Sequence, residues 1–370
     1  MIWLAAVPAL AAAAYYLLVL AAAARWPRST SVAAASGELP PVSILKPVRG
    51  HDPRFYQALR SHAEQDYPEF EMLFGVSDPE DPAIADIERL RREFPQRAIS
   101  LHVVRSAAPN AKVGVLEELS RRARFGVLLV NDSDIKVDAG YLRAVTAPLA
   151  DRRVGLVTCL YRAWAERWPG RLESLGIATE FGPSVLVARM LGQAEFALGS
   201  TMVFREAVLR EIGGFGALAD YLADDYQLGR HIHQRGYAIV FANSVVETNL
   251  GGERWADVWK HQVRWSRTIR VSRPQGYYGY VVTHATLWAL VACAAGAWWA
   301  GAIALGLRMA AGVWIGAGIL KDRRAATDAW LIPVRDLFGF AVWLAGAAGS
   351  TVEWRGQKLR LSADGKIRKA

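Results

Sequence analysis

Cysteine is scarce in this sequence of 370 residues, which contains only Cys159 and Cys293. Because the two lie far apart and the second sits in an apolar run, they indicate neither a disulfide framework nor a cysteine-ligated metal site. Charged residues make up only 21% of the chain, whereas 52% of its residues are hydrophobic and 14 are Trp. This composition does not fit disordered or collagen-like proteins, so we expect a folded chain.

The sequence also lacks a recognisable motif for binding RNA or DNA, although it is basic. It has 44 Lys and Arg residues against 35 Asp and Glu residues, a formal net charge of +9. A basic segment beside anionic lipid explains this excess, so we expect membrane lipids and no nucleic acid as partners. The length allows roughly two domains. The mean hydropathy of +0.12 is unusual for a soluble enzyme, which directs attention to the apolar runs.

The apolar residues are concentrated at the two ends of the chain. Residues 1–24 include no charged side chain, which predicts a transmembrane anchor, followed by a linker over 25–39. A cleaved signal peptide is the alternative, but the positively charged start of such peptides is missing. Near the other end, residues 275–307 carry no charge apart from His284 if it is protonated. This run is too long for one ordinary core helix.

We therefore expect membrane helices over 275–353, comprising two spans near 278–298 and 301–320 and a third hydrophobic element over 337–352. The basic tail over 354–370 carries six Lys and Arg residues against one Asp. The positive-inside tendency places this tail, the start of the linker and the central region in the cytoplasm. The chain must then cross an odd number of times, so we expect the third element to be re-entrant or interfacial.

Residues 40–250 have the pattern of an α/β domain. Short apolar strands alternate with amphipathic helices, which predicts βαβ units and a mostly parallel sheet covered on both faces. The predicted strands are 42–46, 70–76, 99–104, 127–130 and 154–160, and the predicted helices are 54–63, 83–94 and 113–123. Sheets of this kind bind ligands beyond the carboxyl ends of their strands.

Acidic residues follow two of the predicted strands. Asp78 and Asp81 come after strand 70–76, where an Asp followed by Pro indicates either an ordinary turn or a site. Asp132 and Asp134 come after strand 127–130. In near-extended backbone, side chains at i and i+2 point the same way, and two carboxylates held together need a cation nearby. Oxygen ligands suit Mg²⁺ or Mn²⁺, with a diphosphate completing the shell; the alternative is that Asp134 only caps the next helix.

Two further motifs carry functional groups. Asp224 and Asp225 precede a predicted helix, where the helix dipole favours acids. We expect one of them to cap the helix, which leaves the second free for proton transfer. The segment 251–274 is amphipathic and Trp-rich, and is typical of a helix at a membrane interface. It contains His261-Gln262-Val263-Arg264-Trp265.

Six motifs stand in a characteristic order. They are Pro41-Val42-Ser43-Ile44-Leu45-Lys46-Pro47, Asp78 with Asp81-Pro82-Ala83, Asp132-Ser133-Asp134, Gly213-Gly214-Phe215, Asp224-Asp225-Tyr226 and Arg264-Trp265. This arrangement resembles the ceramide glucosyltransferase family, membrane-bound inverting glycosyltransferases with a GT-A catalytic domain, and its bacterial relatives, including hopanoid-associated glycosyltransferases. The resemblance extends from the first span to Glu353-Trp354-Arg355-Gly356, and so covers almost the whole chain.

The resemblance implies roles for the acids. Asp78 or Asp81 would lie near the uridine of the donor, together with Asp132. Asp132 and Asp134 would form the DxD-like pair that holds the metal. Asp225, the second carboxylate before Tyr226, would be the catalytic base.

The resemblance also implies roles for basic and aromatic residues. Arg264 and Trp265 match the closing Gln/Arg-x-x-Arg-Trp motif of the family and would close over the diphosphate and the acceptor. His261 stands where Gln or Arg is usual, and would still donate a hydrogen bond to the diphosphate. Lys112 is the last residue of Asn110-Ala111-Lys112, which is similar to the family's Asn-Pro-Lys segment without the proline and implies a phosphate contact by Lys112.

The resemblance implies an α/β GT-A domain over 40–250, with transmembrane helices at both ends of the chain. The protein would be a metal-dependent, inverting transferase that moves a hexose from a UDP-sugar to a hydroxyl of ceramide or a hopanoid polyol. It would be a multi-pass protein of the bacterial inner membrane with its catalytic domain in the cytoplasm. The apolar residues 181–198 would either line a lipid groove or pack in the core.

Three alternatives are less favoured. A processive polysaccharide synthase would share the acids and the Arg-Trp motif, but it needs a translocation channel, and three or four hydrophobic elements are too few. A metal-dependent membrane hydrolase would usually add His ligands, and no His of this sequence has ligand spacing to the Asp132 loop. A non-catalytic membrane scaffold would leave the acidic motifs without a reason.

Overall fold

The computed structural model describes residues 2–29, 39–51, 54–251, 254–354 and 357–369. Most of the expected linker over 25–39 lies outside these residues, as do Arg355 and Gly356 of the C-terminal motif. The chain divides into two compact units, each built from separate stretches of sequence. The sheet unit comprises Ser29–Tyr161 and Ala194–Asn249, and the helical unit comprises Met1–Arg28, Arg162–Gln193 and Leu250–Ala370. The expected domain over 40–250 therefore includes one stretch, Arg162–Gln193, that belongs to the helical unit.

The sheet unit contains a mixed seven-stranded sheet in the order β3-β2-β1-β4-β6-β5-β7. Strands β1 to β4 are parallel, and β6 runs antiparallel to both β4 and β5. The strands are β1 (Val42–Val48), β2 (Phe70–Val76), β3 (Ala98–Val103), β4 (Val127–Val130), β5 (Val154–Trp164), β6 (Met202–Arg205) and β7 (Ala238–Asn249). Every residue of β1, β2 and β4 is buried, as the apolar runs of these strands predict for a parallel sheet covered on both sides.

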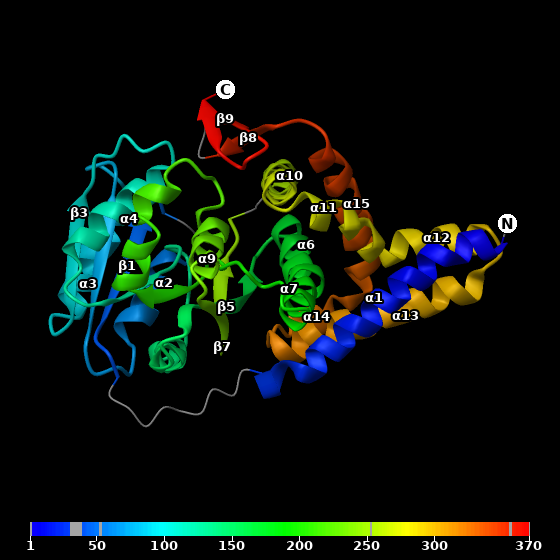
Figure 1. Ribbon diagram of the computed structural model, residues 1–370, viewed down its shortest axis with the longest axis horizontal. Helices are drawn as coiled ribbons and strands as arrows, with labels where there is room; N and C mark the ends of the chain where they lie inside the picture. The colour runs from blue at the N-terminus through cyan, green and yellow to red at the C-terminus, as the bar shows by residue number, and fades with distance from the viewer. Residues whose placement is uncertain (1, 30–38, 52–53, 252–253, 355–356, 370) are drawn as a thin grey trace. The chain divides into compact units, whose positions relative to one another are not determined.

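Helices cover both faces of this sheet (Figure 1). One face packs against α2, α3 and α5, and the other against α4, α8, η3 and α9. Ile44 and Leu45 are neighbours in β1 that belong to opposite core clusters, as the alternation of side chains along a strand requires. The helices are α2 (Phe55–Ala63), α3 (Ala83–Glu93), α4 (Ala111–Arg122), α5 (Tyr141–Thr146), η1 (Ala147–Ala150), α8 (Glu206–Glu211), η3 (Phe215–Leu218) and α9 (Asp224–Gln234). The expected α/β class with a mostly parallel sheet is thus confirmed.

The helical unit is built mainly from apolar helices. Tyr16 on α1 donates a hydrogen bond of 2.8 Å to Thr283 O, and α12 and α13 pack against each other (Figure 1). The elements are α1 (Ile2–Ser29), α6 (Trp168–Gly176), η2 (Ile177–Phe181), α7 (Gly182–Met190), α10 (Trp255–Ser272), α11 (Pro274–Gly279), η4 (Tyr280–Thr283), α12 (Ala285–Ala294), α13 (Trp298–Val313), η5 (Trp314–Ile319), α14 (Arg324–Thr327), η6 (Ala329–Leu331) and α15 (Ile332–Ala347). A small antiparallel sheet follows, with β8 (Thr351–Trp354) at the start of the basic tail and β9 (Gln357–Leu361) and β10 (Ile367–Lys369) within the tail.

Three helical stretches among the described residues are long and apolar enough to cross a membrane: Ile2–Trp26, Trp298–Ile319 and Ala329–Ala347. The span expected near 278–298 is interrupted, because the chain bends at His284 and again at Gly296, whose φ is +87°. What remains is the shorter apolar helix α12. The third hydrophobic element starts earlier than its expected range of 337–352 and reaches spanning length. Whether it crosses, re-enters or lies at the interface stays a prediction.

In two of these stretches, the pattern of buried and exposed side chains is the opposite of that in helices of soluble proteins. On α1, Leu4 is 78% exposed, whereas Ala9 is completely buried. In the third stretch, Trp330 is 66% exposed, whereas Arg335 and Asp336 are buried. Large apolar side chains thus face outwards while small or charged ones face inwards, which is the arrangement expected of helices surrounded by lipid.

Candidate active site

The loop after β4 carries the first pair of acids. Asp132 O accepts a hydrogen bond of 3.3 Å from Ile135 N, so residues 132–135 form a turn rather than the near-extended backbone expected for them. The two side chains consequently have different partners. Asp132 Oδ1 lies 2.9 Å from Lys112 Nζ, whereas Asp134 Oδ2 accepts hydrogen bonds from Thr248 Oγ1 and, at 3.2 Å, from Asn249 N.

Buried polar residues hold the start of this loop. Asn131 is completely buried, and its Nδ2 lies 2.8 Å from His62 Nε2. His62 Nδ1 lies 3.0 Å from Ala58 O, which assigns the proton to Nδ1 and makes Nε2 the acceptor. Burial and the charge of Lys46 hold the pKa of His62 well below its usual value. The imidazole is therefore a neutral hydrogen-bonding partner of the Asn131 side chain.

Lys46 is a residue of this site for which the sequence suggested no role. It lies on β1, is completely buried, and donates a hydrogen bond of 3.3 Å to Asp132 O. Burial lowers the pKa of Lys46 to about 7, although the charges of Asp134 and Asp132 act in the opposite direction. A lysine inside an otherwise apolar strand was the available signal, because such a side chain needs a polar partner in the fold.

Lys112 lies between two of the predicted acids. It follows Asn110, whose Oδ1 accepts hydrogen bonds from the first turn of α4. Its Nζ lies 2.9 Å from Asp132 Oδ1 and 3.2 Å from Asp224 Oδ2. Burial alone lowers the pKa of Lys112, but the carboxylates of Asp132 and Asp224 outweigh it and raise the pKa above its usual value. Lys112 is thus a permanent cation that balances the acids, and its phosphate contact stays a prediction.

Asp225 stands at the start of α9, next to Asp224, whose Oδ2 pairs with Lys112. Its Oδ2 accepts a hydrogen bond of 2.9 Å from Gly199 N, and its Oδ1 accepts one of 2.7 Å from Tyr226 N. Burial and the neighbouring charge of Asp224 raise the pKa of Asp225 to about 6, against the lowering effect of Lys112. Asp224 is ion-paired with Lys112, so the two adjacent acids have different environments.

Gly199 lies where the two candidate acids converge. A Cβ atom built on Gly199 would lie 3.1 Å from Asp225 Oδ2 and 3.3 Å from Asp132 Oδ2. Both carboxylates therefore pack over this glycine, at the carboxyl end of β4 where an α/β sheet binds its ligands. The structure thus brings together Asp132, Lys112 and Asp225, three of the residues predicted from the sequence.

The two acids after β2, Asp78 and Asp81, differ in burial and in their hydrogen-bond partners. Asp81 is buried, and its carboxylate accepts hydrogen bonds of 2.9 Å from Gly50 N and 3.0 Å from Ala83 N. It thereby joins the segment after β1 to the start of α3. Asp78 is exposed, and its Oδ1 accepts a hydrogen bond of 2.9 Å from Glu80 N. Of the two residues predicted to lie near the uridine, Asp78 is thus the one accessible at the surface.

His261, Arg264 and Trp265 lie on α10 and belong to the helical unit. His261 Nδ1 lies 2.5 Å from Oε1 of Glu173, a buried residue of α6 for which the sequence suggested no role. The ring centroids of His261 and Trp265 are 4.6 Å apart. The sequence carried no signal for Glu173, because 88 residues separate the two partners.

Comparisons with known proteins identify the family. Residues 1–367 match the model of glycosyl transferase family 21. The chain belongs to this family. Ceramide glucosyltransferase 3 of Caenorhabditis elegans is 29% identical over 202 residues, 54% of this chain and 44% of that protein. A ceramide glucosyltransferase of Komagataella phaffii is 33% identical over 112 residues, 29% of this chain and 22% of that protein. The family 21 chain thus matches less than half the length of these curated relatives.

A solved structure shares the fold of the family 21 chain. The mannosyltransferase PcManGT from Pyrobaculum calidifontis, determined in complex with GDP-Man and Mn²⁺, has a TM-score of 0.55 at 19% sequence identity. The likeness covers 93% of this chain and 97% of that one. The glycosyltransferase fold and the ceramide glucosyltransferase family expected from the sequence are therefore both confirmed.

The acidic residues at this site of the family 21 chain offer carboxylate oxygens, which are suitable ligands for a divalent cation. No group of three or more His, Cys, Asp or Glu residues is placed to hold a metal in the part of the chain that the structure describes. Oxygen atoms of Asp132 and Asp225 nevertheless converge on Gly199. Mg²⁺ in nucleotide enzymes is typically bound by one or two carboxylates together with substrate phosphates. These residues fit such a shared shell, although Asp134 Oδ2 faces Thr248.

Proposed function

We propose that this protein is an inverting glycosyltransferase that moves a hexose from a UDP-sugar to a hydroxyl of a membrane lipid, ceramide or a hopanoid polyol. The observation that carries this proposal is the convergence of Asp132 and Asp225 on Gly199, in a chain that matches family 21 along almost its entire length. The ceramide glucosyltransferases among its relatives support a lipid acceptor.

Asp225 is the proposed base. A general base must be deprotonated and within hydrogen-bond reach of the hydroxyl that attacks. A pKa of about 6 satisfies the first condition at neutral pH while keeping the carboxylate basic enough to accept a proton. The backbone N–H groups of Gly199 and Tyr226 fix its orientation. One attack on the anomeric carbon, without a covalent intermediate, inverts its configuration.

Asp132 and Asp134 are the proposed ligands of Mn²⁺ or Mg²⁺. When bound, the cation would neutralise the charge that develops on the leaving diphosphate. Lys112 holds Asp132 through an ion pair of 2.9 Å and would lie beside the phosphates. PcManGT, which shares the fold, was determined with Mn²⁺. Asp78 would contact the uridine, while Arg264 and Trp265 would close over the diphosphate and the acceptor.

The apolar helical stretches support a membrane location. We propose a multi-pass protein of the bacterial inner membrane with its catalytic domain in the cytoplasm. A lipid acceptor whose polar head lies at the membrane surface would then reach the acids without leaving the bilayer. The apolar residues 181–198 either line the path of this lipid or pack in the core.

Transfer of radiolabel from UDP-sugars to extracted lipid tests the proposal. The intact protein should yield a labelled lipid, and a chelator should reduce the yield. Asp225→Asn should lower transfer by about 10²–10⁴-fold, the usual contribution of a general base, while UDP binding stays measurable. Asp66→Asn is the matched control, because this exposed acid of the sheet unit pairs only at the surface with Arg143. Absence of a lipid product with every UDP-sugar and acceptor would refute the proposal.

A further inference from the structure

Asn110 makes hydrogen bonds in two directions from the start of α4. It is completely buried. Its Oδ1 accepts hydrogen bonds of 3.0 Å from Lys112 N and 3.3 Å from Val113 N, and so caps the helix. Its Nδ2 donates one of 2.8 Å to Tyr221 O, and its backbone N–H donates one of 2.9 Å to Ala219 O. The cap therefore accounts for the amide oxygen of Asn110 but not for its amide nitrogen.

The two carbonyl acceptors lie in the segment 219–223, which leads from η3 to α9. Asp224 and Asp225 are the first two residues of α9. An ion pair joins the same two regions, because Lys112 Nζ lies 3.2 Å from Asp224 Oδ2. In addition, η3 packs against α4 in the core on this face of the sheet. The start of α4 thus fixes the place of the segment that precedes Asp225.

Helix capping alone does not explain an asparagine at position 110. Aspartate and serine cap helices about as well as asparagine does. An aspartate side chain, however, has no N–H group that could donate to Tyr221 O. Substitutions at this position can therefore remove the hydrogen bond to Tyr221 while they keep the cap of α4.

Lys112 extends the same arrangement to the second acid of the site. Besides Asp224, its Nζ contacts Asp132 Oδ1 at 2.9 Å. The other oxygen of Asp132 converges with Asp225 on Gly199. The first residues of α4 are thus connected both to the loop that carries Asp132 and to the segment that precedes Asp225, and all of these residues belong to the sheet unit.

We propose that Asn110 is a positioning residue, which sets the place of Asp225 relative to Asp132 by holding the segment 219–223 against the start of α4. This inference rests on the proposed function, in which Asp225 is the base. A general base acts only within hydrogen-bond reach of the attacking hydroxyl. Displacement of a catalytic group by about 1 Å lowers the rate by about 10²-fold, so small movements of this segment affect catalysis.

Asn110→Asp removes the donor and keeps the cap. We expect kcat for sugar transfer to fall about tenfold, because the base moves by less than about 1 Å. The affinity for UDP should stay close to that of the natural protein, because Lys112 and Asp132 are unchanged. Steady-state transfer assays and calorimetry with UDP on the detergent-solubilised full-length protein measure the two effects. Asn110→Ser also keeps a cap, adds no acid and should show the same split; it decides if Asn110→Asp does not fold.

A second comparison separates positioning of the base from a general defect. When Asn110→Asp is added to Asp225→Asn, the residual transfer rate should not fall further, because a carboxylate that is absent cannot be misplaced. A purely structural role of Asn110 would instead lower the residual rate by the same factor as in the natural protein. An equal loss in both backgrounds would therefore overturn the inference.

Arg121 supplies the matched control on the same helix. It pairs with Glu117 and Glu118 at the surface, so Arg121→Gln removes polar contacts of α4 away from its start. This variant should leave kcat and UDP affinity unchanged. Unchanged kcat in the Asn110 variants, or a loss of UDP affinity as large as the loss of kcat, would also overturn the inference. Absence of UDP binding and of sugar transfer by the natural protein would instead refute the proposed function.

Discussion

At the scale of single residues, Gly199 shows how the absence of a side chain can organise a charged site. Its N–H holds Asp225 Oδ2 at 2.9 Å, and its missing Cβ lets the carboxylates of Asp132 and Asp225 approach the same point. The φ of Gly199 is outside the left-handed range, so its backbone conformation is open to alanine. The requirement at this position is therefore one of space rather than of backbone conformation.

Gly199→Ala should lower kcat several-fold, because the two carboxylates must each move by a few tenths of an ångström, whereas displacement of a catalytic group by about 1 Å lowers the rate by about 10²-fold. The affinity for UDP should fall as well, since the new methyl group also lies 3.3 Å from the carboxylate of Asp132, a proposed metal ligand beside the nucleotide. Gly140→Ala is the control, because a Cβ atom there meets nothing within 4 Å. Steady-state transfer assays and UDP calorimetry check the prediction. Unchanged kcat in Gly199→Ala would show that the acids do not depend on this contact.

The pKa of Asp225 predicts the acid limb of the pH profile. Asp225 must be deprotonated to act as a base, and its pKa of about 6 means that protonation removes activity as the pH falls below this value. We expect kcat/KM to fall about tenfold for each pH unit below about 6. Initial rates at subsaturating UDP-sugar between pH 4.5 and about 8 test this prediction. A flat profile would exclude Asp225 as the base, whereas Asp66→Asn should keep the profile of the natural protein.

Sequence patterns pointed to the acids of the candidate site but not to the residues that orient them. Asp132 and Asp225 could be predicted because each stands at the end of a strand or the start of a helix, and both positions are visible in local periodicity. Asp134 hydrogen-bonds Thr248, 114 residues away, and this contact accompanies a turn where extended backbone was expected. Only the folded chain brings such distant partners together.

At the scale of elements, apolar runs bounded by polar residues were predicted to the residue, as in β2 and β4. In the seven-stranded sheet, β6 and β7 were not predicted, and neither were β8, β9 and β10 of the small sheet. β6 is only four residues long, and half of the residues of β7 are half-buried, without a regular alternation along the strand. Hydropathy also missed the interruption at Gly296, because it measures compatibility with lipid and is insensitive to a single residue with a φ of +87°.

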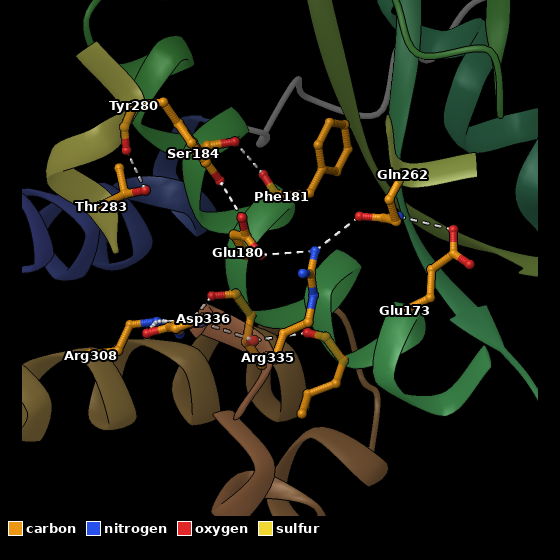
Figure 2. Close-up of polar contacts among 12 residues, drawn as sticks. Glu173, Glu180, Phe181, Ser184, Gln262, Tyr280, Thr283, Arg308, Arg335 and Asp336 are labelled. Atoms are coloured by element: carbon orange, nitrogen blue, oxygen red, sulfur yellow. Dashed lines mark hydrogen bonds and ion pairs between the residues drawn. The ribbon is translucent and has the colours of Figure 1, made fainter. Parts of the chain in front are cut away.

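A buried ion pair joins two of the apolar helices. Arg308 on α13 is completely buried and lies 2.7 Å from Asp336 on α15, and its Nη1 donates to Thr179 O on η2. Among the residues that the structure describes, each of these two buried charges has the other as its ion-pair partner (Figure 2). Thr286 Oγ1 donates a further hydrogen bond of 2.8 Å to Asp336.

Arg308→Leu should destabilise the helical unit by about 3–5 kcal/mol, because it leaves a buried carboxylate without its counterion. Arg308→Leu combined with Asp336→Leu should recover much of this loss, since neither charge then remains. Thermal unfolding in detergent, followed by near-UV circular dichroism, measures both effects. The pair of Arg210 with Glu206 on α8 is the control, because it is exposed at the surface. Removing the Arg210 guanidinium should change the free energy of unfolding only a little. A double variant no more stable than Arg308→Leu would contradict the assignment.

At the scale of the whole molecule, the connection between two candidate spans presents cations outwards and acids inwards. Lys321 and Arg323 are exposed, and Trp330 nearby is 66% exposed. Asp322 and Asp328 are buried; Asp322 Oδ1 accepts a hydrogen bond from Arg324 N, and Asp328 pairs with an arginine of α6. An exposed cationic surface with an aromatic residue at the end of an apolar stretch suits anionic lipid headgroups.

Lys321→Gln combined with Arg323→Gln should reduce the anionic phospholipid that remains bound during purification in mild detergent. Each basic residue near a membrane surface contributes about 1 kcal/mol, so we expect a several-fold decrease. Lipid mass spectrometry with phosphatidylcholine as internal reference measures it. Arg92→Gln combined with Arg152→Gln removes two exposed charges of the sheet unit as the control. Equal retention in both double variants would show that this surface does not select anionic lipid.

The stretch Arg162–Gln193 belongs to the helical unit but lies in the sequence between the two stretches of the sheet unit. This excursion of the chain determines how the sheet unit can be prepared alone. A truncated protein that runs straight through residues 40–250 would keep α6, η2 and α7 while losing the helices that cover them, and would therefore tend to aggregate. The two ends of the excursion return to neighbouring places in the sheet, because Leu198 N donates a hydrogen bond of 3.0 Å to Thr158 Oγ1. Replacing 162–193 with a short Gly-Ser bridge is the rational route to a soluble fragment for crystallisation with nucleotide.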